Sequence, residues 1–203
     1  MKDSAQHLES GEATGDSRNR ILDVAEQLYM ERGYRAVSLR DIANALSIKQ
    51  ASLYYHFPDG KEQLFEAVVE RAMLRHKAGI EAVVAAQLPN IRRQLLAVIE
   101  WFNSQPPMNF TAMMHTDMPA LRPERTKALE VTAHRALFEP LFGIVIQAMQ
   151  RGEIRPINPA MMAGMMLAVL SGLEYGLRQV AEAERPRMIE EVVDLLLQGL
   201  YPR

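Results

Sequence analysis

The chain has 203 residues, of which 48% are hydrophobic and 24% charged, an ordinary balance for a globular protein of one large domain or two small ones. It has no cysteine, which excludes disulfides, thiolate metal sites and cysteine nucleophiles. No apolar run approaches the roughly 20 residues that span a bilayer, so we expect a cytoplasmic protein without a membrane partner.

The first predicted helix follows a polar segment. Residues 1–16 lack an apolar signal core and predict a disordered tail. After them, apolar side chains recur at helical spacing, and Gly33 is a typical residue to end the helix. The apolar positions are Ile21, Leu22, Ala25, Leu28 and Tyr29.

A capping box predicts where the second helix begins. The Ser38 hydroxyl can accept from the backbone N–H of Asp41, and the Asp41 side chain can reach back. The helix that follows is short. Its inward positions are Ile42, Ala43 and Leu46.

A third helix follows a tight turn at Ser47 and Ile48. It extends to about His56, because Pro58 disfavours a helical residue before it. Although the whole chain has a formal net charge of −2, the stretch Ile42 to Pro58 contains no acidic residue. Such a local surface can approach phosphates even in a mildly acidic protein.

Longer helices occupy the remainder of the chain. Asp59, with Glu62 three residues later, predicts the start of a linker helix that ends near Gly79. Prolines divide the rest into helices. We expect them over residues 91–104, 123–151 with a kink at Pro140, 159–183, and from Pro186 onward.

These elements predict an all-α fold with two domains. An N-terminal three-helix domain over residues 17–78 has helix-turn-helix order, and its second short helix suits the major groove. The linker helix joins it to a larger α-helical domain over residues 79–203, which we expect to bind a ligand and to form a dimer.

The segment VSLRDIANALSIKQASLYYHFPDGKEQLF resembles the DNA-binding domain of TetR-family transcriptional regulators. The family pattern has a Thr or Ser cap, an Ile-Ala pair, a Leu-Tyr-x-His-Phe helix end and then Lys-Glu-x-Leu. This chain has Ser38, Ile42-Ala43, Leu53 to Phe57 and Lys61 to Leu64 in that register. It departs from the pattern in the turn. Ser47 replaces a frequent Gly, and Lys49 replaces a frequent Ser cap, so Ser47 is a second candidate to cap the recognition helix.

The resemblance implies roles for individual residues. Ser38 and Lys61 match phosphate contacts at helix N-termini, and Arg18, Arg20 and Arg40 are candidates for further backbone contacts. The candidates for base contacts are Lys49, Gln50, Ser52 and Tyr54, whereas Tyr55 and His56 match phosphate contacts.

The methionines of the C-terminal half have two interpretations. Most of the thirteen lie between Met108 and Met166, where they either fill the core or line an adaptable pocket for a hydrophobic effector. The candidate pocket residues are Trp101, Phe102, Phe110, Met113, Met114, Met118, Phe138, Met162, Met166 and Tyr175. Glu174 is a candidate for a polar anchor in the pocket or for a position at a dimer seam.

By resemblance, the long helices from Pro123 and Pro159 pair with their copies in a homodimer. The candidate interface residues are Leu137, Leu141, Phe142, Val145, Val169, Leu173 and Leu177. No spacing of histidines and acids matches a metal site, and we expect no cofactor.

The resulting hypothesis is a repressor rather than an enzyme. It binds a palindromic operator on double-stranded DNA as a dimer and is released by a small, hydrophobic effector. Two other classes are a helix-turn-helix module that binds a protein and an all-α enzyme that uses the C-terminal cavity. The chain shows no nucleophile–base pair for the enzyme.

Overall fold

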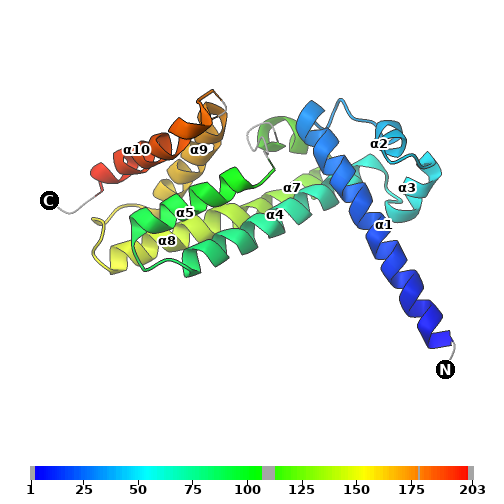
Figure 1. Ribbon diagram of the computed structural model, residues 1–203, viewed down its shortest axis with the longest axis horizontal. Helices are drawn as coiled ribbons and strands as arrows, with labels where there is room; N and C mark the ends of the chain where they lie inside the picture. The colour runs from blue at the N-terminus through cyan, green and yellow to red at the C-terminus, as the bar shows by residue number, and fades with distance from the viewer. Residues whose placement is uncertain (1–2, 107–112, 178, 201–203) are drawn as a thin grey trace. The chain divides into compact units, whose positions relative to one another are not determined.

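The computed structural model describes the backbone of residues 3–106, 113–177 and 179–200, and their side chains from Asp16 onward except Glu174 and Tyr175. Within these ranges all regular elements are helical, as the sequence predicts (Figure 1). No helix among them is long and apolar enough to cross a membrane. The candidate pocket residue Phe110 and the side chain of Tyr175 fall outside the described parts.

The chain forms two compact units. The first contains Met1–Arg71 and Ala112–Leu129, and the second contains Ala72–Thr111 and Glu130–Arg203. The sequence predicts one boundary near residue 78, whereas these units divide after Arg71 and a later segment of the chain also joins the first unit. Helices α4 (Lys61–Ala85) and α7 (Pro123–Ala133) each contribute residues to both units.

Helix α1 (Asp3–Arg32) opens the first unit and begins within the segment for which the sequence predicts a disordered tail. Its apolar positions are buried from Ile21 onward, on the face that the periodicity predicts. The helix ends where expected. Gly33 has a φ of 78°, and its N–H donates to the carbonyl of Tyr29 at 2.8 Å.

Two short helices and the start of α4 complete this unit, together with a π-helical turn at Met113–Asp117, a 3₁₀ turn at Met118–Ala120 and the first part of α7. The short helices are α2 (Leu39–Ala45) and α3 (Gln50–His56). An ion pair ties α4 to α1, because the Arg71 guanidinium contacts Asp23 at 2.7 Å and Glu26 at 2.6 Å. Glu26 is buried, so this pairing compensates for the loss of its hydration.

The second unit packs α5 (Ile91–Ser104) and α8 (Glu139–Gln150) with α9 (Pro159–Leu177) and α10 (Arg185–Gln198). The predicted cap of α9 is present. The Asn158 side chain accepts from the N–H of Met161 at 3.0 Å, and Pro159 is the first helical residue. Between α5 and α10, the Arg92 guanidinium binds Asp194 at 2.6 Å.

The predicted kink at Pro140 takes the form of a π-helical turn. Helix α7 is followed by the turn His134–Phe138 and then by α8, so the expected helix 123–151 is divided just before the proline. Proline has no N–H to donate to residue i−4, and a wider turn accommodates its ring.

Candidate nucleic-acid interface

The capping box that begins α2 is formed as predicted. The N–H of Asp41 donates to the Ser38 hydroxyl oxygen at 3.2 Å, and the N–H of Ser38 donates to the Asp41 carboxylate at 2.8 Å. The hydroxyl of Ser38 also donates to that carboxylate. These bonds from Ser38 hold the pKa of Asp41 below its usual range. The predicted phosphate contact Ser38 thus has its hydroxyl committed to the cap in this structure.

The turn between α2 and α3 depends on a strained residue. Ser47 has a φ of 56°, in the left-handed region that glycine adopts without penalty. Its N–H donates to Asn44 and the N–H of Ile48 to Ala43, both at 3.0 Å, which is the Schellman pattern. Ser47 therefore ends α2. Lys49 precedes α3 instead, and its side chain makes no capping bond.

Helix α3 presents a polar face and is held by its apolar face. Leu53 and Phe57 are fully buried, and the Arg18 guanidinium lies 5.1 Å from the centre of the Phe57 ring. The candidate base contacts are all exposed; they are Lys49, Gln50, Ser52 and Tyr54. Tyr55 is also exposed, and His56 is half-buried with its ring edge-on to Tyr55 at 5.1 Å.

The remaining predicted DNA contacts differ in accessibility. Arg18, Arg20 and Arg40 are exposed. Lys61 is half-buried: its Nζ lies 4.2 Å from the centre of the Tyr34 ring and 3.4 Å from the carbonyl oxygen of Arg35. Burial lowers the pKa of Lys61, against the opposing field of Asp117. In this conformation the ammonium group is occupied within the first unit.

The α3 region and the rest of the chain both resemble known regulators. A family model described as bacterial regulatory proteins of the tetR family matches residues 21–68. The regulator UidR of Escherichia coli K12 is 27% identical over 173 residues, which is 83% of each chain. The crystal structure of the TetR-family regulator PfmR from Thermus thermophilus is 27% identical, with a TM-score of 0.72 over 90% of this chain and 100% of that one.

Residues 21–68 form a DNA-binding domain of the TetR family, and the similarity to PfmR extends over 90% of the chain. A shorter match with higher sequence identity covers about a quarter of the chain. A negative transcriptional regulator of a biofilm operon, IcaR of Staphylococcus aureus strain Newman, is 45% identical over 53 residues, or 26% of this chain and 28% of that one. The matched segment includes α2 and α3, and the regulators that match the chain make it a DNA-binding transcriptional regulator.

The predicted effector residues lie in both units of the chain. Met113, Met114 and Met118 belong to the first unit, whereas the other described candidates belong to the second. Met162 and Met166 are buried on α9. The remaining described candidates in the second unit are Trp101, Phe102 and Phe138.

Aromatic residues of α4 and α5 form one cluster in the second unit. Phe102 stacks on His76 with ring centres 4.8 Å apart, and the Trp101 ring lies directly on the backbone at Gly79. His76 is buried and was not a sequence candidate. Its position in the apolar row between Met73 and Ile80 was the signal that could have identified it.

Among the described residues, the second unit contains a narrow apolar gap and an open groove. The gap lies between α5, α8, α9 and α10 and has a volume of about 20 Å³, room for about one water molecule. Met166 contributes to this gap, with Leu95, Val98, Leu141 and Val193. Met162 contributes to the groove along α9 and α10, whose volume is about 520 Å³.

Most of the predicted dimer residues are buried within the chain itself. The buried ones are Leu137, Leu141, Val145, Leu173 and Leu177, while Phe142 and Val169 are half-buried. Exposed apolar side chains lie elsewhere on the C-terminal helices: Met161 and Met165 on α9 and Leu195 on α10. Within the described residues, no group of three or more His, Asp or Glu side chains is placed to hold a metal ion.

Proposed function

We propose that this regulator is a homodimeric repressor in the bacterial cytoplasm, that α3 of each subunit binds one half of a palindromic operator, and that a small apolar effector releases it. It acts by binding rather than by catalysis. The repressive role is supported by the similarity of its N-terminal domain to IcaR, a negative regulator.

The observation that carries the DNA-binding part is the construction of α3. The helix is fixed by Leu53 and Phe57 on one side, and it exposes hydrogen-bonding side chains without a carboxylate on the other. Base edges in the major groove require this combination of a rigid scaffold and free donors and acceptors. A seven-residue helix contacts only a few base pairs, so a second copy is needed for a specific site.

The exposed apolar groove of α9 and α10 supports the homodimer. Met161, Met165 and Leu195 are more than 45% exposed and line the same groove. Exposed apolar patches of this kind are typical of protein–protein contacts. We therefore place the dimer contact on this groove, in preference to the buried residues that the sequence predicted.

The apolar gap in the second unit supports the effector part of the proposal. At about 20 Å³ it is too small for an effector, so the surrounding helices must separate for a ligand to enter. Met166 is unbranched and adapts to altered packing more readily than leucine or valine. Entry would then favour a state of the protein other than the one that binds DNA.

A binding assay on purified protein tests the DNA-binding proposal. Duplexes selected from a random pool should bind at least about 10³-fold more tightly than unselected duplexes at the same salt concentration. The affinity should fall steeply with salt, because the bound phosphates release counterions. A salt-insensitive interaction, or a failure to enrich any sequence, would contradict the repressor proposal.

A graded series of n-alkanols tests the effector proposal on the selected operator. Each added CH₂ group should tighten alkanol binding by roughly fourfold until the gap is filled, as expected for about 0.8 kcal/mol of buried apolar surface per group. Operator release should follow the same order. Release that does not depend on chain length would contradict an apolar effector site.

A further inference from the structure

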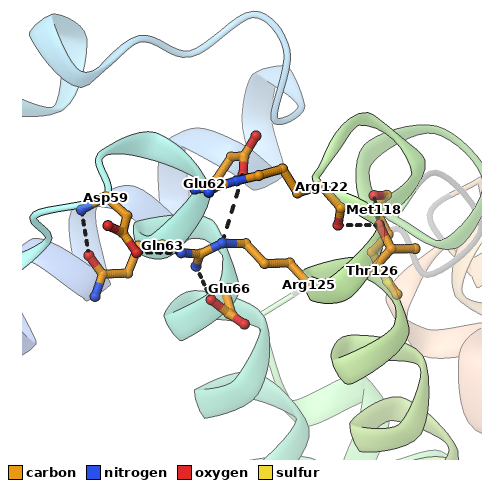
Figure 2. A network of polar contacts seen from close by, with 8 residues as sticks. All are labelled: Asp59, Glu62, Gln63, Glu66, Met118, Arg122, Arg125 and Thr126. Carbon is orange, nitrogen blue, oxygen red and sulfur yellow. Dashed lines mark hydrogen bonds and ion pairs between the residues drawn. The ribbon is translucent and has the colours of Figure 1, made fainter.

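An arginine clamp joins the start of α7 to the start of α4 within the first unit. It consists of Arg122 and Arg125 with the carboxylates of Asp59, Glu62 and Glu66. Figure 2 shows both arginine side chains directed toward α4. None of these residues was a candidate site residue from the sequence, because the partners are separated by about sixty positions.

Arg125 is the centre of the clamp. Its guanidinium donates to Asp59 at 2.6 Å and to Glu66, and its Nε lies 3.8 Å from Glu62. The Arg125 side chain is only 15% exposed, so its ion pairs are less screened than surface pairs. The first turn of α7, which contains Arg125, is also fixed, because the Thr126 hydroxyl donates to the carbonyl of Met118 at 2.8 Å.

Arg122 contributes much less to the same cluster. Its side chain is 59% exposed and pairs with Glu62 at 2.8 Å, without a contact to Asp59 among the described interactions. Exposed pairs of this kind contribute little to stability. Arg122 therefore has the same charge as Arg125 and lies about one helical turn away, but it does not hold the loop that contains Asp59.

Asp59 lies in the short turn that follows the recognition helix. Phe57 ends α3, and the N–H of Gly60 donates to its carbonyl at 2.9 Å. Asp59 makes two hydrogen bonds that hold this turn, one through its backbone and one through its side chain. Its N–H donates to the Gln63 side chain at 3.0 Å, and its carboxylate accepts from Arg125. The sequence predicted that Asp59 caps α4 with Glu62, but its carboxylate is directed to Arg125 instead.

We propose that Arg125 is a positioning residue for DNA recognition, which fixes the orientation of α3 by holding the Phe57–Gly60 turn through Asp59. This inference rests on the proposed function of α3. Arg125 is not available to contact DNA, because its guanidinium is surrounded by carboxylates and its side chain is only 15% exposed. The recognition helix is only seven residues long and uncapped at its start, so its position depends on such external contacts.

The test compares the affinities of two variants for the selected operator and for random-sequence duplexes. Arg125→Ala should weaken operator binding by roughly tenfold, the effect of losing one base contact, with less than about twofold change on random duplexes. Arg122→Ala is the matched control, since it removes the same charge at the same end of α7. It should change both affinities equally and slightly.

A second variant distinguishes positioning from simple electrostatics. Asp59→Asn removes a negative charge near the DNA-binding surface, so electrostatics alone predicts tighter binding to every duplex. The positioning role predicts weaker operator binding even where binding to random duplexes becomes tighter. Asp59 is 56% exposed, so this variant keeps the fold even if Arg125→Ala does not.

The possible outcomes are separable. If Arg125→Ala loses no more operator affinity than Arg122→Ala, or if Asp59→Asn binds the operator more tightly, the positioning role is wrong while the repressor proposal stands. If the wild-type protein selects no sequence at all, the proposed function itself fails.

Discussion

Ser47 has the only positive φ found among the non-glycine residues that the structure describes. An L-residue in this region places its Cβ close to the following carbonyl, at a cost of about 1 kcal/mol. Two backbone hydrogen bonds that end α2 fix this left-handed conformation, so the strain at the Ser47 Cβ remains in the folded protein. Ser47 is exposed, so burial of its side chain does not offset this cost.

We expect Ser47→Gly to raise the free energy of unfolding by about 1 kcal/mol, because glycine has no Cβ to strain. Urea denaturation at fixed protein concentration measures the change. Ser52→Gly is the control, since Ser52 is an exposed residue inside α3 with helical geometry. It should lower the stability instead, and the same sign for both variants would contradict the strain.

Replacing Lys61 tests whether a lysine that contacts Tyr34 and Arg35 in the free protein also contributes to DNA binding. If it contacts a phosphate in the complex, Lys61→Ala should weaken binding to all sequences similarly and reduce the slope of log K against log salt by about one. The salt slope of Lys49→Ala provides the comparison, because this variant removes an exposed lysine. A lowered melting temperature with an unchanged slope would instead assign Lys61 to the contact with Tyr34.

The sequence predicted single residues well where local chemistry decides their position. The capping box at Ser38 and Asp41 involves neighbours in the chain, and it is present as predicted. The roles of Lys61 and Asp59 were harder to predict, because their partners Tyr34 and Arg125 are distant in sequence. Cap patterns describe possible local bonds, but a distant guanidinium can compete for the same carboxylate.

At the scale of elements, helix ends with a local capping signal were easier to predict than helix faces. Other ends were predicted wrongly: α4 extends to Ala85 instead of ending near Gly79, and α9 ends at Leu177 instead of near residue 183. Asn158 and Gly33 mark ends through local backbone bonds. Helix α9 is apolar over most of its circumference, so periodicity could not separate the buried face with Leu173 from the exposed one with Met161. This is why the predicted dimer residues are mostly buried within the chain.

The start of α2 should make stability depend on pH. The pKa of Asp41 is lowered in the folded protein, so its carboxylate stabilises the fold above the ordinary Asp pKa, and this contribution is lost as the pH falls through the lowered value. Asp41→Asn should therefore destabilise the protein at pH 7, and the difference from wild type should shrink as the pH is lowered below the ordinary Asp pKa. Thermal unfolding at several pH values measures it.

The partner serine supplies the control for this prediction. Its hydrogen bonds are the first cause of the shift, so in a Ser38→Ala background the effect of Asp41→Asn should lose most of its pH dependence. An undiminished pH dependence in that background would assign the shift to another neighbour.

At the scale of the whole molecule, the exposed groove of α9 and α10 determines assembly in our proposal. Leu195→Glu should convert the dimer to a monomer, since Leu195 is 70% exposed and a buried, unpaired carboxylate at an apolar contact is costly. Analytical ultracentrifugation measures the dimer dissociation constant, and operator affinity should fall with it.

Leu74→Glu controls for the loss of an exposed leucine. Leu74 lies on α4, is 65% exposed and does not line the groove. It should leave the dimer intact. Equal dissociation by both variants, or by neither, would contradict the assignment of the dimer contact to α9 and α10.

Trp101 is the only tryptophan in the chain, and it belongs to the second unit. Its ring rests on the backbone at Gly79, and its indole N–H is buried without a hydrogen-bond partner among the described residues. Tryptophan fluorescence of the unlabelled protein therefore reports on this unit alone, and the buried indole nitrogen predicts emission at shorter wavelengths than a fully exposed indole gives. A red shift on adding a compound, in the absence of DNA, would record the opening of α4 from α5 in real time.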